Sequence, residues 1–172
     1  MILLLGSHLF TGVTASALPK ETIYLEPTDF LSEVFEIKVP APQMLWLTKD
    51  LQPSVQQILG HPYKTLRIRY WKKATKSAWI LEEIGKFKPI TTGIAINSRK
   101  IETIKVLIYR ESHGWEIKKS FFTDQFKEVE LQENLKLNQR IDGISGATLS
   151  VNALKKLSRL ALYLDSKVPE SN

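Results

Sequence analysis

Residues 90–109 read ITTGIAINSRKIETIKVLIY, and their pattern indicates the central architecture of the chain. Two runs rich in Ile and Thr flank the polar tetrapeptide at 97–100, a pattern typical of two strands joined by a tight turn. Just upstream, residues 66–71 read LRIRYW, an alternation that predicts a half-buried strand. We therefore expect an antiparallel meander with strands at about 66–71, 78–83, 90–96 and 101–109.

Helical patterns flank this meander on both sides. Before it, Thr28 is expected to cap a short helix. A second helix is expected to have Pro53 in its first turn and to stop at Gly60. Their buried residues are expected to be Phe30, Leu31, Val34 and Phe35 in the first helix and Val55, Ile58 and Leu59 in the second. After the meander, one helix is expected to carry Trp115, Phe122 and Phe126 on one stripe, and a final helix to carry Val151, Leu154, Leu157, Ala161 and Leu164. The order helix, sheet, helix predicts an α+β fold, in which an antiparallel sheet packs with helices.

The composition narrows the possible chemistry. A chain of 172 residues with 43% hydrophobic and 24% charged residues is long enough for one globular domain with a sizeable core. It contains no cysteine, which excludes disulfide scaffolds, zinc–thiolate sites, iron–sulfur clusters and thiol catalysis. The formal net charge of +6 favours an anionic partner.

The N-terminus suggests export. Residues 2–17 read ILLLGSHLFTGVTASA, an apolar stretch too short to span a membrane, which ends in the small-x-small pattern of a signal-peptidase site. We interpret residues 1–17 as a cleaved signal peptide; a start site further upstream, a buried N-terminal strand and a short uncleaved anchor are the alternatives. Export of a chain without cysteine suits a bacterial periplasm. We expect the rest to divide into an N-terminal helical and strand extension packed on the domain (18–74), the main domain (75–165) and a C-terminal tail (166–172).

The chemistry is expected in residues 142–150, DGISGATLS, a polar loop that leads into the final helix. Gly143 and Gly146 permit tight turns and the close approach of another group. Ser145, Thr148 and Ser150 place hydroxyls near a helix N-terminus, where free N–H groups and the helix dipole favour an anion. Two interpretations stay open: a seat for a phosphate, or a helix start capped by Ser150 with the glycines as turn residues. Walker and Rossmann loops are excluded, because no Lys follows the glycines and no G-x-G-x-x-G occurs.

The same nonapeptide resembles the flavinylation motif of the FMN-binding domain family, which includes the flavin-bearing subunits of sodium-pumping NADH:quinone reductase. Residues 89–94 (PITTGI) resemble the strand that opens that domain, and residues 109–116 (YRESHGWE) resemble its Glu-containing flavin loop. The resemblance covers about residues 75–165. In this family the Thr of the motif bonds to FMN through a phosphodiester that a dedicated extracytoplasmic flavin transferase installs, and the matching residue here is Thr148.

The resemblance implies a set of cofactor-binding residues around the attachment point. They are Asp142, Ser145, Gly146, Ala147, Thr148 and Ser150 in the motif and Glu111, His113 and Gly114 in the upstream loop. For three of them a structural alternative stays open: an exposed strand-end carboxylate for Glu111, a solvated loop side chain for His113, and a cap of the turn for Asp142, which otherwise presents the motif to the transferase. No catalytic group and no metal site is expected.

Cationic and aromatic side chains alternate between residues 63 and 76. They are Lys64, Arg67, Arg69, Lys72, Lys73 and Lys76, with Tyr63, Tyr70 and Trp71 between them. We interpret this stretch as a basic strand edge that blocks unwanted pairing. A docking surface for an acidic redox partner is the alternative, and export argues against binding to nucleic acid.

These observations predict an exported flavoprotein that carries FMN covalently on Thr148 and relays electrons in an extracytoplasmic chain. Its expected partners are the flavin transferase and a membrane-bound electron donor or acceptor. The expected location is the periplasm, with membrane association as an alternative. We expect a redox carrier or a subunit of an oxidoreductase system more than a stand-alone enzyme. The alternative is a flavin-free basic periplasmic module that docks an acidic protein or an anionic ligand.

Overall fold

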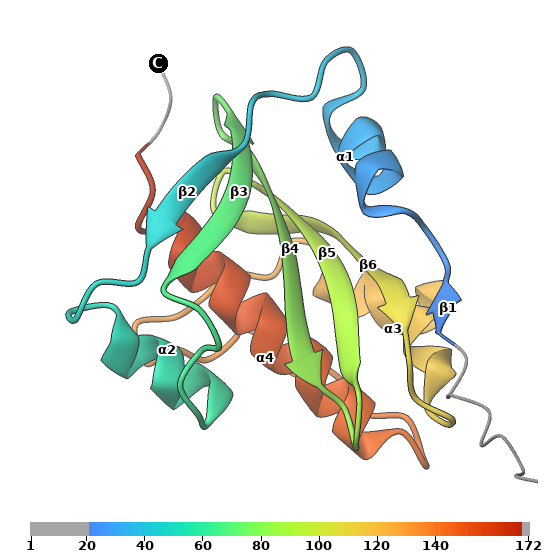
Figure 1. Cartoon of the computed structure of the whole chain (residues 1–172). Coiled ribbons are helices and arrows are strands. Elements are labelled where there is room, and N and C mark those ends of the chain that lie inside the picture. Colours follow the sequence, from blue (N-terminus) through green and yellow to red (C-terminus); the bar gives the residue numbers. More distant parts are fainter. Residues whose placement is uncertain (1–20, 170–172) are drawn as a thin grey trace, which may run out of the picture.

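A six-stranded antiparallel sheet forms the centre of the molecule, in the order β1-β6-β5-β4-β3-β2 (Figure 1). The computed structural model describes residues 21–169. The strands are β1 (Thr22–Ile23), β2 (Gln43–Trp46), β3 (Arg67–Lys73), β4 (Lys76–Ile84), β5 (Pro89–Asn97) and β6 (Lys100–Tyr109). Strands β3 to β6 follow one another in the chain and in the sheet, so the predicted meander is confirmed.

Helices cover both faces of this sheet (Figure 1). The elements are the α-helices α1 (Pro27–Phe35), α2 (Gln52–Leu59), α3 (Ser120–Thr123) and α4 (Thr148–Asp165) and the short 3₁₀ helices η1 (Trp115–Lys118) and η2 (Asp124–Phe126). The long helix α4 packs across β4 and β5, with α2 beside it, and α1 lies on the opposite face. The α+β class is therefore confirmed.

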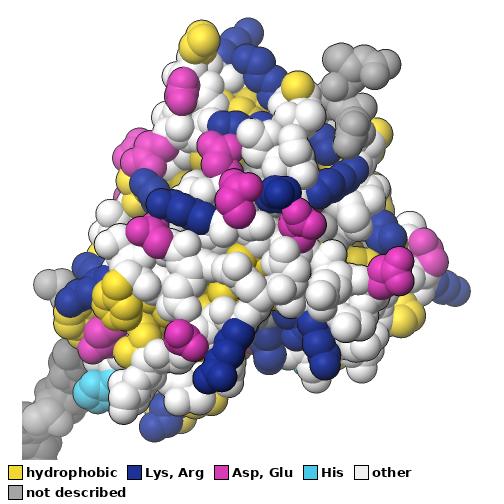
Figure 2. Space-filling view, turned by 180° about the vertical axis from the view of Figure 1, so that it is seen from behind, with side chains coloured by type: hydrophobic (Ala, Val, Ile, Leu, Met, Phe, Trp, Pro, Cys, Tyr) yellow, Lys and Arg dark blue, Asp and Glu magenta, His cyan; other side chains and the backbone are white. Residues whose placement is uncertain are grey.

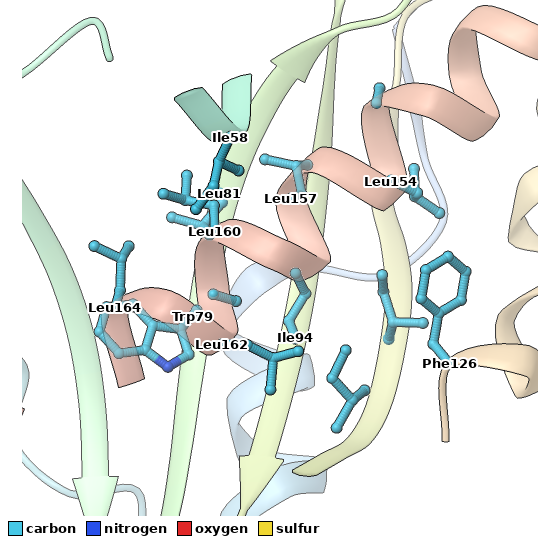
Figure 3. Packing of buried hydrophobic residues seen from close by; sticks show 14 of the residues in the cluster. Ile58, Trp79, Leu81, Ile94, Phe126, Leu154, Leu157, Leu160, Leu162 and Leu164 are labelled. Atoms are coloured by element: carbon cyan, nitrogen blue, oxygen red, sulfur yellow. The ribbon is translucent and has the colours of Figure 1, made fainter. Parts of the chain in front are cut away.

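The larger core lies between α4 and the sheet (Figure 3). Leu157 and Leu160 of α4 face Trp79, Leu81 and Ile94 of the sheet, and all five side chains are buried. The apolar stripe predicted for the last helix is buried along its whole length, since Val151, Leu154, Leu157, Ala161 and Leu164 are all buried. This packing fixes the start of α4 relative to the ends of β4 and β5.

A second, smaller core lies under α1. Its buried residues are Phe30, Leu31, Val34 and Phe35 of the helix and Ala78, Ala95 and Leu107 of the sheet, as predicted for the helix face. An ideal Cβ on Gly93 would lie 2.7 Å from ring atoms of Phe30. Glycine at this position in β5 therefore gives the ring direct access to the backbone of the strand.

Helix boundaries differ from the prediction in two places. α1 begins at Pro27 with Glu26 as N-cap, so Thr28 lies inside the helix; proline at the first helical position has the required φ already. The expected helix through Trp115, Phe122 and Phe126 is replaced by η1, α3 and η2, and Lys119, which has extended backbone angles, separates η1 from α3. Phe122 and Phe126 are buried, but Trp115 is 41% exposed.

The interpretation of the basic stretch as a strand edge is wrong. β3 pairs with β2 on one side and β4 on the other, and β2 is the edge strand. Lys72 is buried, with its Nζ 3.7 Å from Oδ1 of Asp165 at the C-terminal end of α4. One of the six cations therefore serves an internal ion pair.

The predicted signal peptide at 1–17 lies outside the described residues. The division of the chain at 17, 74 and 165 stays a prediction, although β2 and β3 join the same sheet as the later strands. Among the helices of residues 21–169, none is both long and apolar enough to cross a membrane.

Candidate functional site

The predicted motif forms the loop before α4 and the first turn of the helix. Thr148 is the first helical residue and Ala147 is the N-cap, whose carbonyl accepts from the N–H of Val151 at 2.9 Å. No side chain of residues 21–169 caps this end, so the N–H groups of residues 148–150 have no protein acceptor there. The expectation that Ser150 is the N-cap is wrong, since Ser150 lies inside the first turn.

A tight turn over residues 144–147 precedes the helix. The N–H of Ala147 donates to the carbonyl of Ile144 at 3.0 Å, and Gly146 has φ of +79°, the left-handed value that glycine adopts without strain. An ideal Cβ on Gly146 would meet nothing within 4 Å. The backbone is therefore open to solvent at the point where the loop becomes the helix.

Ser150 connects the motif to the upstream loop. Tyr109 donates its hydroxyl proton to the carbonyl of His113, and its oxygen lies 3.0 Å from Oγ of Ser150. Because that proton is already donated, Ser150 acts as the donor to Tyr109. Burial, the largest cause, raises the pKa of Tyr109 in spite of the Ser150 hydrogen bond, so the phenol keeps its proton.

Gly114 allows the two loops to touch. It has φ of +87°, and an ideal Cβ there would lie 2.8 Å from Oγ of Ser150 and 3.0 Å from the hydroxyl of Tyr109. Any side chain at this position would push the first turn of α4 away from the end of β6. Gly114 is therefore a packing requirement of the site.

Glu111 binds the turn between β4 and β5. Its Oε1 accepts from the backbone N–H groups of Lys86, Phe87 and Lys88, at 2.5, 2.5 and 2.9 Å. Partial burial is the largest single effect and raises the pKa, but the three N–H donors together outweigh it and hold the pKa of Glu111 below its ordinary value of 4.5. The carboxylate thus fixes the turn at the sheet end where β6 finishes.

Asp142 is held through its backbone. Its N–H donates to Oε1 of Gln125 at 2.7 Å, while its exposed carboxylate lies 3.3 Å from Nε of Arg140. Gln125 belongs to η2, and its carbonyl also accepts from Gln139. The start of the motif is therefore anchored by η2, and the Asp142 side chain stays accessible.

The predicted site residues fall into two groups. Ala147, Ser150 and Gly114 pack together with Tyr109, whereas Ser145, Gly146, Thr148 and His113 are exposed around them. Glu111 and Asp142 hold neighbouring segments in place. The sequence patterns did not identify Tyr109 as the centre of this arrangement. The feature that could have indicated it is a tyrosine at an inward position near the end of a strand, because its hydroxyl needs a hydrogen-bond partner.

One family model matches this region. Residues 85–163 match the model of the FMN-binding domain. This part of the chain belongs to the FMN-binding domain family. All of the predicted cofactor-binding residues lie inside the matched range, and the match supports FMN as the cofactor and a flavin-binding role in electron transfer. No curated protein matches the chain.

The residues of the FMN-binding domain fit a phosphate-bearing cofactor. The start of α4 offers three N–H groups without a protein acceptor in the described chain, next to an exposed hydroxyl at Thr148. Such a helix start stabilises a negative charge by about 0.3 to 1 kcal/mol. The open backbone at Gly146 leaves room for the group to reach these donors.

Proposed function

We propose that this FMN-binding domain carries FMN covalently, through a phosphodiester on Oγ1 of Thr148. The observation that carries the proposal is the position of Thr148: it is exposed, it is the first residue of α4, and the N–H groups around it lack a side-chain cap. A phosphodiester keeps one negative charge. The free N–H groups form the positive end of the helix dipole and would stabilise that charge.

The attachment reaction is a phosphoryl transfer. The Oγ1–P bond forms as the bond between phosphorus and its leaving group breaks, so the donor must be a flavin nucleotide whose phosphate carries a leaving group. The hydroxyl proton of Thr148 passes to a base, which we assign to the flavin transferase, because the described residues place no carboxylate or imidazole in hydrogen-bond contact with Thr148. Asp142, with its accessible carboxylate six positions before Thr148, presents the motif to that enzyme.

The remaining site residues position the cofactor. Ser150 and Tyr109 lock the first turn of α4 against the end of β6, and Glu111 locks the neighbouring β4–β5 turn. His113 stands exposed in the loop between them, where its ring can donate to the phosphate or the flavin. When bound, FMN supplies the electron-accepting and electron-donating ring, and the protein supplies its position and electrostatic surroundings.

We further propose that the domain acts as an electron relay outside the cytoplasm, with a membrane-bound donor or acceptor. A covalent link suits that compartment, because a tethered flavin stays at high effective concentration where free FMN would diffuse away. The predicted signal sequence and the absence of cysteine support export to a periplasm.

The first prediction tests the attachment residue. Co-expression with a flavin transferase should give a yellow protein whose denatured gel band fluoresces and whose mass increases by one FMN phosphodiester. Thr148→Ala should lose the fluorescent band completely, while Thr148→Ser should keep part of it because a hydroxyl remains. Ser145→Ala is the matched control, since it removes a hydroxyl from the same loop, and it should stay flavinylated.

Two results would contradict this proposal. Fluorescence of the denatured Thr148→Ala protein would place the bond elsewhere. A colourless wild-type protein after co-expression with an active transferase would favour the alternative, a flavin-free basic module that docks an anionic partner. Circular dichroism of each variant separates loss of attachment from loss of folding.

A further inference from the structure

The exposed stripe of α4 is cationic. The helix buries most of its residues, and its solvent-facing positions are Thr148, Leu149, Asn152, Lys155, Lys156 and Arg159. The one acidic residue of α4, Asp165, is buried at the far end in contact with Lys72. The stripe that begins with the proposed attachment residue thus continues as three cations without an acidic neighbour on the helix.

A cleft beside this stripe adds two more cations. Lys136 and Arg140, from the segment before the motif, line a cavity of about 270 Å³ together with Lys155 and Arg159 of α4. Arg159 is held in place because its Nε donates to the carbonyl of Leu135 at 2.6 Å. We call Lys136, Arg140, Lys155, Lys156 and Arg159 the α4 basic cleft.

The charges of the α4 basic cleft are largely uncompensated. Within residues 21–169 the only carboxylate at ion-pair distance from any of the five cations is Asp142, on Arg140. On the face seen from behind, many Lys and Arg side chains lie among Asp and Glu side chains (Figure 2). The local excess of positive charge in the α4 basic cleft therefore indicates where an anionic partner binds better than the net charge of the chain does.

The cleft lies close to the proposed flavin. Lys155 is two helical turns after Thr148 on the same side of α4, about 10 Å along the axis, and Arg159 is one turn further. A partner that settles on the cleft would cover the region in which the cofactor is attached. Docking there and electron exchange would thus involve the same face.

We propose that the α4 basic cleft docks the acidic surface of the protein that exchanges electrons with this FMN-binding domain. The inference rests on the proposed function for the presence of flavin, and on the geometry for the charge of the partner. The cations are spread along the helix and Arg140 is 90% exposed, which suits several carboxylates on a protein surface better than one small anion in a convergent pocket. Such charge complementarity mainly accelerates association and makes it sensitive to salt.

The test for binding does not depend on flavin. The probe is a fluorescein-labelled hexaglutamate peptide, whose anisotropy is measured with the unflavinylated protein at low salt. We expect weak binding that is lost at ~300 mM salt, where charges are screened beyond a few ångströms. Lys136→Glu with Lys155→Glu should weaken it at least about tenfold, which is 1.4 kcal/mol.

The matched control has the same change of net charge at another place. Lys73 is exposed on the β3–β4 hairpin, next to Lys72, which contacts the opposite end of α4. Lys73→Glu with Lys49→Glu should leave peptide binding within about twofold of wild type, because neither residue lines the α4 basic cleft, where the peptide is expected to bind. Equal losses of peptide binding in both double variants would overturn the proposal. Competition by inorganic pyrophosphate at the same concentration as the peptide would also overturn it, because it would indicate a site for a small anion.

A second measurement uses the flavin-loaded protein. Two molecules of ferricyanide, an anion, or of hexaammineruthenium(III), a cation, each take one electron from the reduced flavin. Lys136→Glu with Lys155→Glu should slow oxidation by ferricyanide several-fold and accelerate oxidation by the ruthenium complex. Unchanged rates with both oxidants would overturn the proposal, whereas absence of flavin in the wild-type protein would refute the proposed function and leave the peptide result standing.

Discussion

The conformation of single residues decides whether the motif can hold a phosphate. Gly146 and Gly143 are both exposed glycines of one loop, and an ideal Cβ on either meets nothing within 4 Å. They differ in backbone, since only Gly146 has a positive φ. Comparing substitutions at Gly146 and Gly143 therefore distinguishes the effect of backbone strain from the effect of an added side chain.

Gly146→Val should reduce the flavin-to-protein ratio sharply and lower the free energy of unfolding by about 1 to 2 kcal/mol, because a β-branched residue is strained at positive φ. Gly143→Val should change both quantities much less. Absorbance after co-expression with the transferase and urea unfolding give the two values. Near-full flavinylation of Gly146→Val would show that the turn does not position the phosphate.

Glu111 makes stability depend on pH in a definite direction. Its pKa is lowered in the folded state, so the folded protein holds the carboxylate charged where the unfolded chain would bind a proton. The stabilisation is present above the unfolded pKa and disappears as the pH falls through the lower folded pKa. Because the group is mostly solvated, the effect is a fraction of what a buried carboxylate would contribute.

Glu111→Gln should therefore destabilise the protein at pH 7 and make the loss of stability between about pH 5 and pH 3 shallower than in wild type. The cause is the loss of three charge-assisted hydrogen bonds to the β4–β5 turn. Glu133→Gln, at an exposed position without a hydrogen bond in the described chain, is the control. Identical pH profiles for wild type and Glu111→Gln would contradict the assignment.

At the scale of elements, α4 is fixed at both ends. At its C-terminal end the buried carboxylate of Asp165 accepts from Ser77 at 2.6 Å and from Arg99 at 2.8 Å, and lies beside the buried Lys72. This cluster joins the helix to β3, β4 and the β5–β6 turn. Removing one charge would leave the others without compensation.

Asp165→Asn should lower the free energy of unfolding by about 3 kcal/mol, because it leaves Lys72 buried and unpaired. Lys72→Met in the same chain should restore part of that loss, since the uncompensated charge is then gone. Urea midpoints of the two single variants and the double variant measure the coupling. Additive losses would show that the two side chains do not depend on each other.

The periodicity of the sequence predicts most helices and strands. It does not predict contacts between side chains that are distant in the sequence. Strands β3 to β6 and the buried face of α4 follow from alternation and from the 3.6-residue repeat. Alternation also puts Lys72 on the same side of β3 as the buried Ile68 and Tyr70, but it does not predict that a cation is buried there, because the partner Asp165 is distant in the chain. The break at Lys119 is equally invisible, since every residue around it tolerates a helix.

The candidate site shows the same division. The motif and the resemblance locate Thr148 and the loops around it, and the family match covers that region. They do not locate the hydrogen bond from Ser150 to Tyr109, which joins residues 41 positions apart. Ser150 is a good N-cap by residue type, but α4 begins three residues earlier than such a cap would require, and its packing turns that hydroxyl inward.

For the whole molecule, the FMN-binding domain and its N-terminal extension share one sheet. The family match begins at residue 85, between β4 and β5, yet Trp79 and Leu81 of β4 lie in the core that supports α4. The proposed cofactor-binding residues lie inside the matched range, and part of the core that supports α4 lies before it.

The short strand β1 holds the N-terminal end of the described chain beside Tyr109, and this determines how the protein would be oriented on an electrode. Thr22 pairs with Tyr109, and the ring of Tyr24 stacks on that of Tyr109 at 6.4 Å between centroids. α4 has 18 residues and is about 27 Å long, so its C-terminal end lies far from Thr148 along the helix axis. Immobilisation on an electrode through a short linker before residue 21 would therefore turn the end of the protein that carries Thr148 toward the metal, whereas a linker after residue 169 would turn it toward the solution.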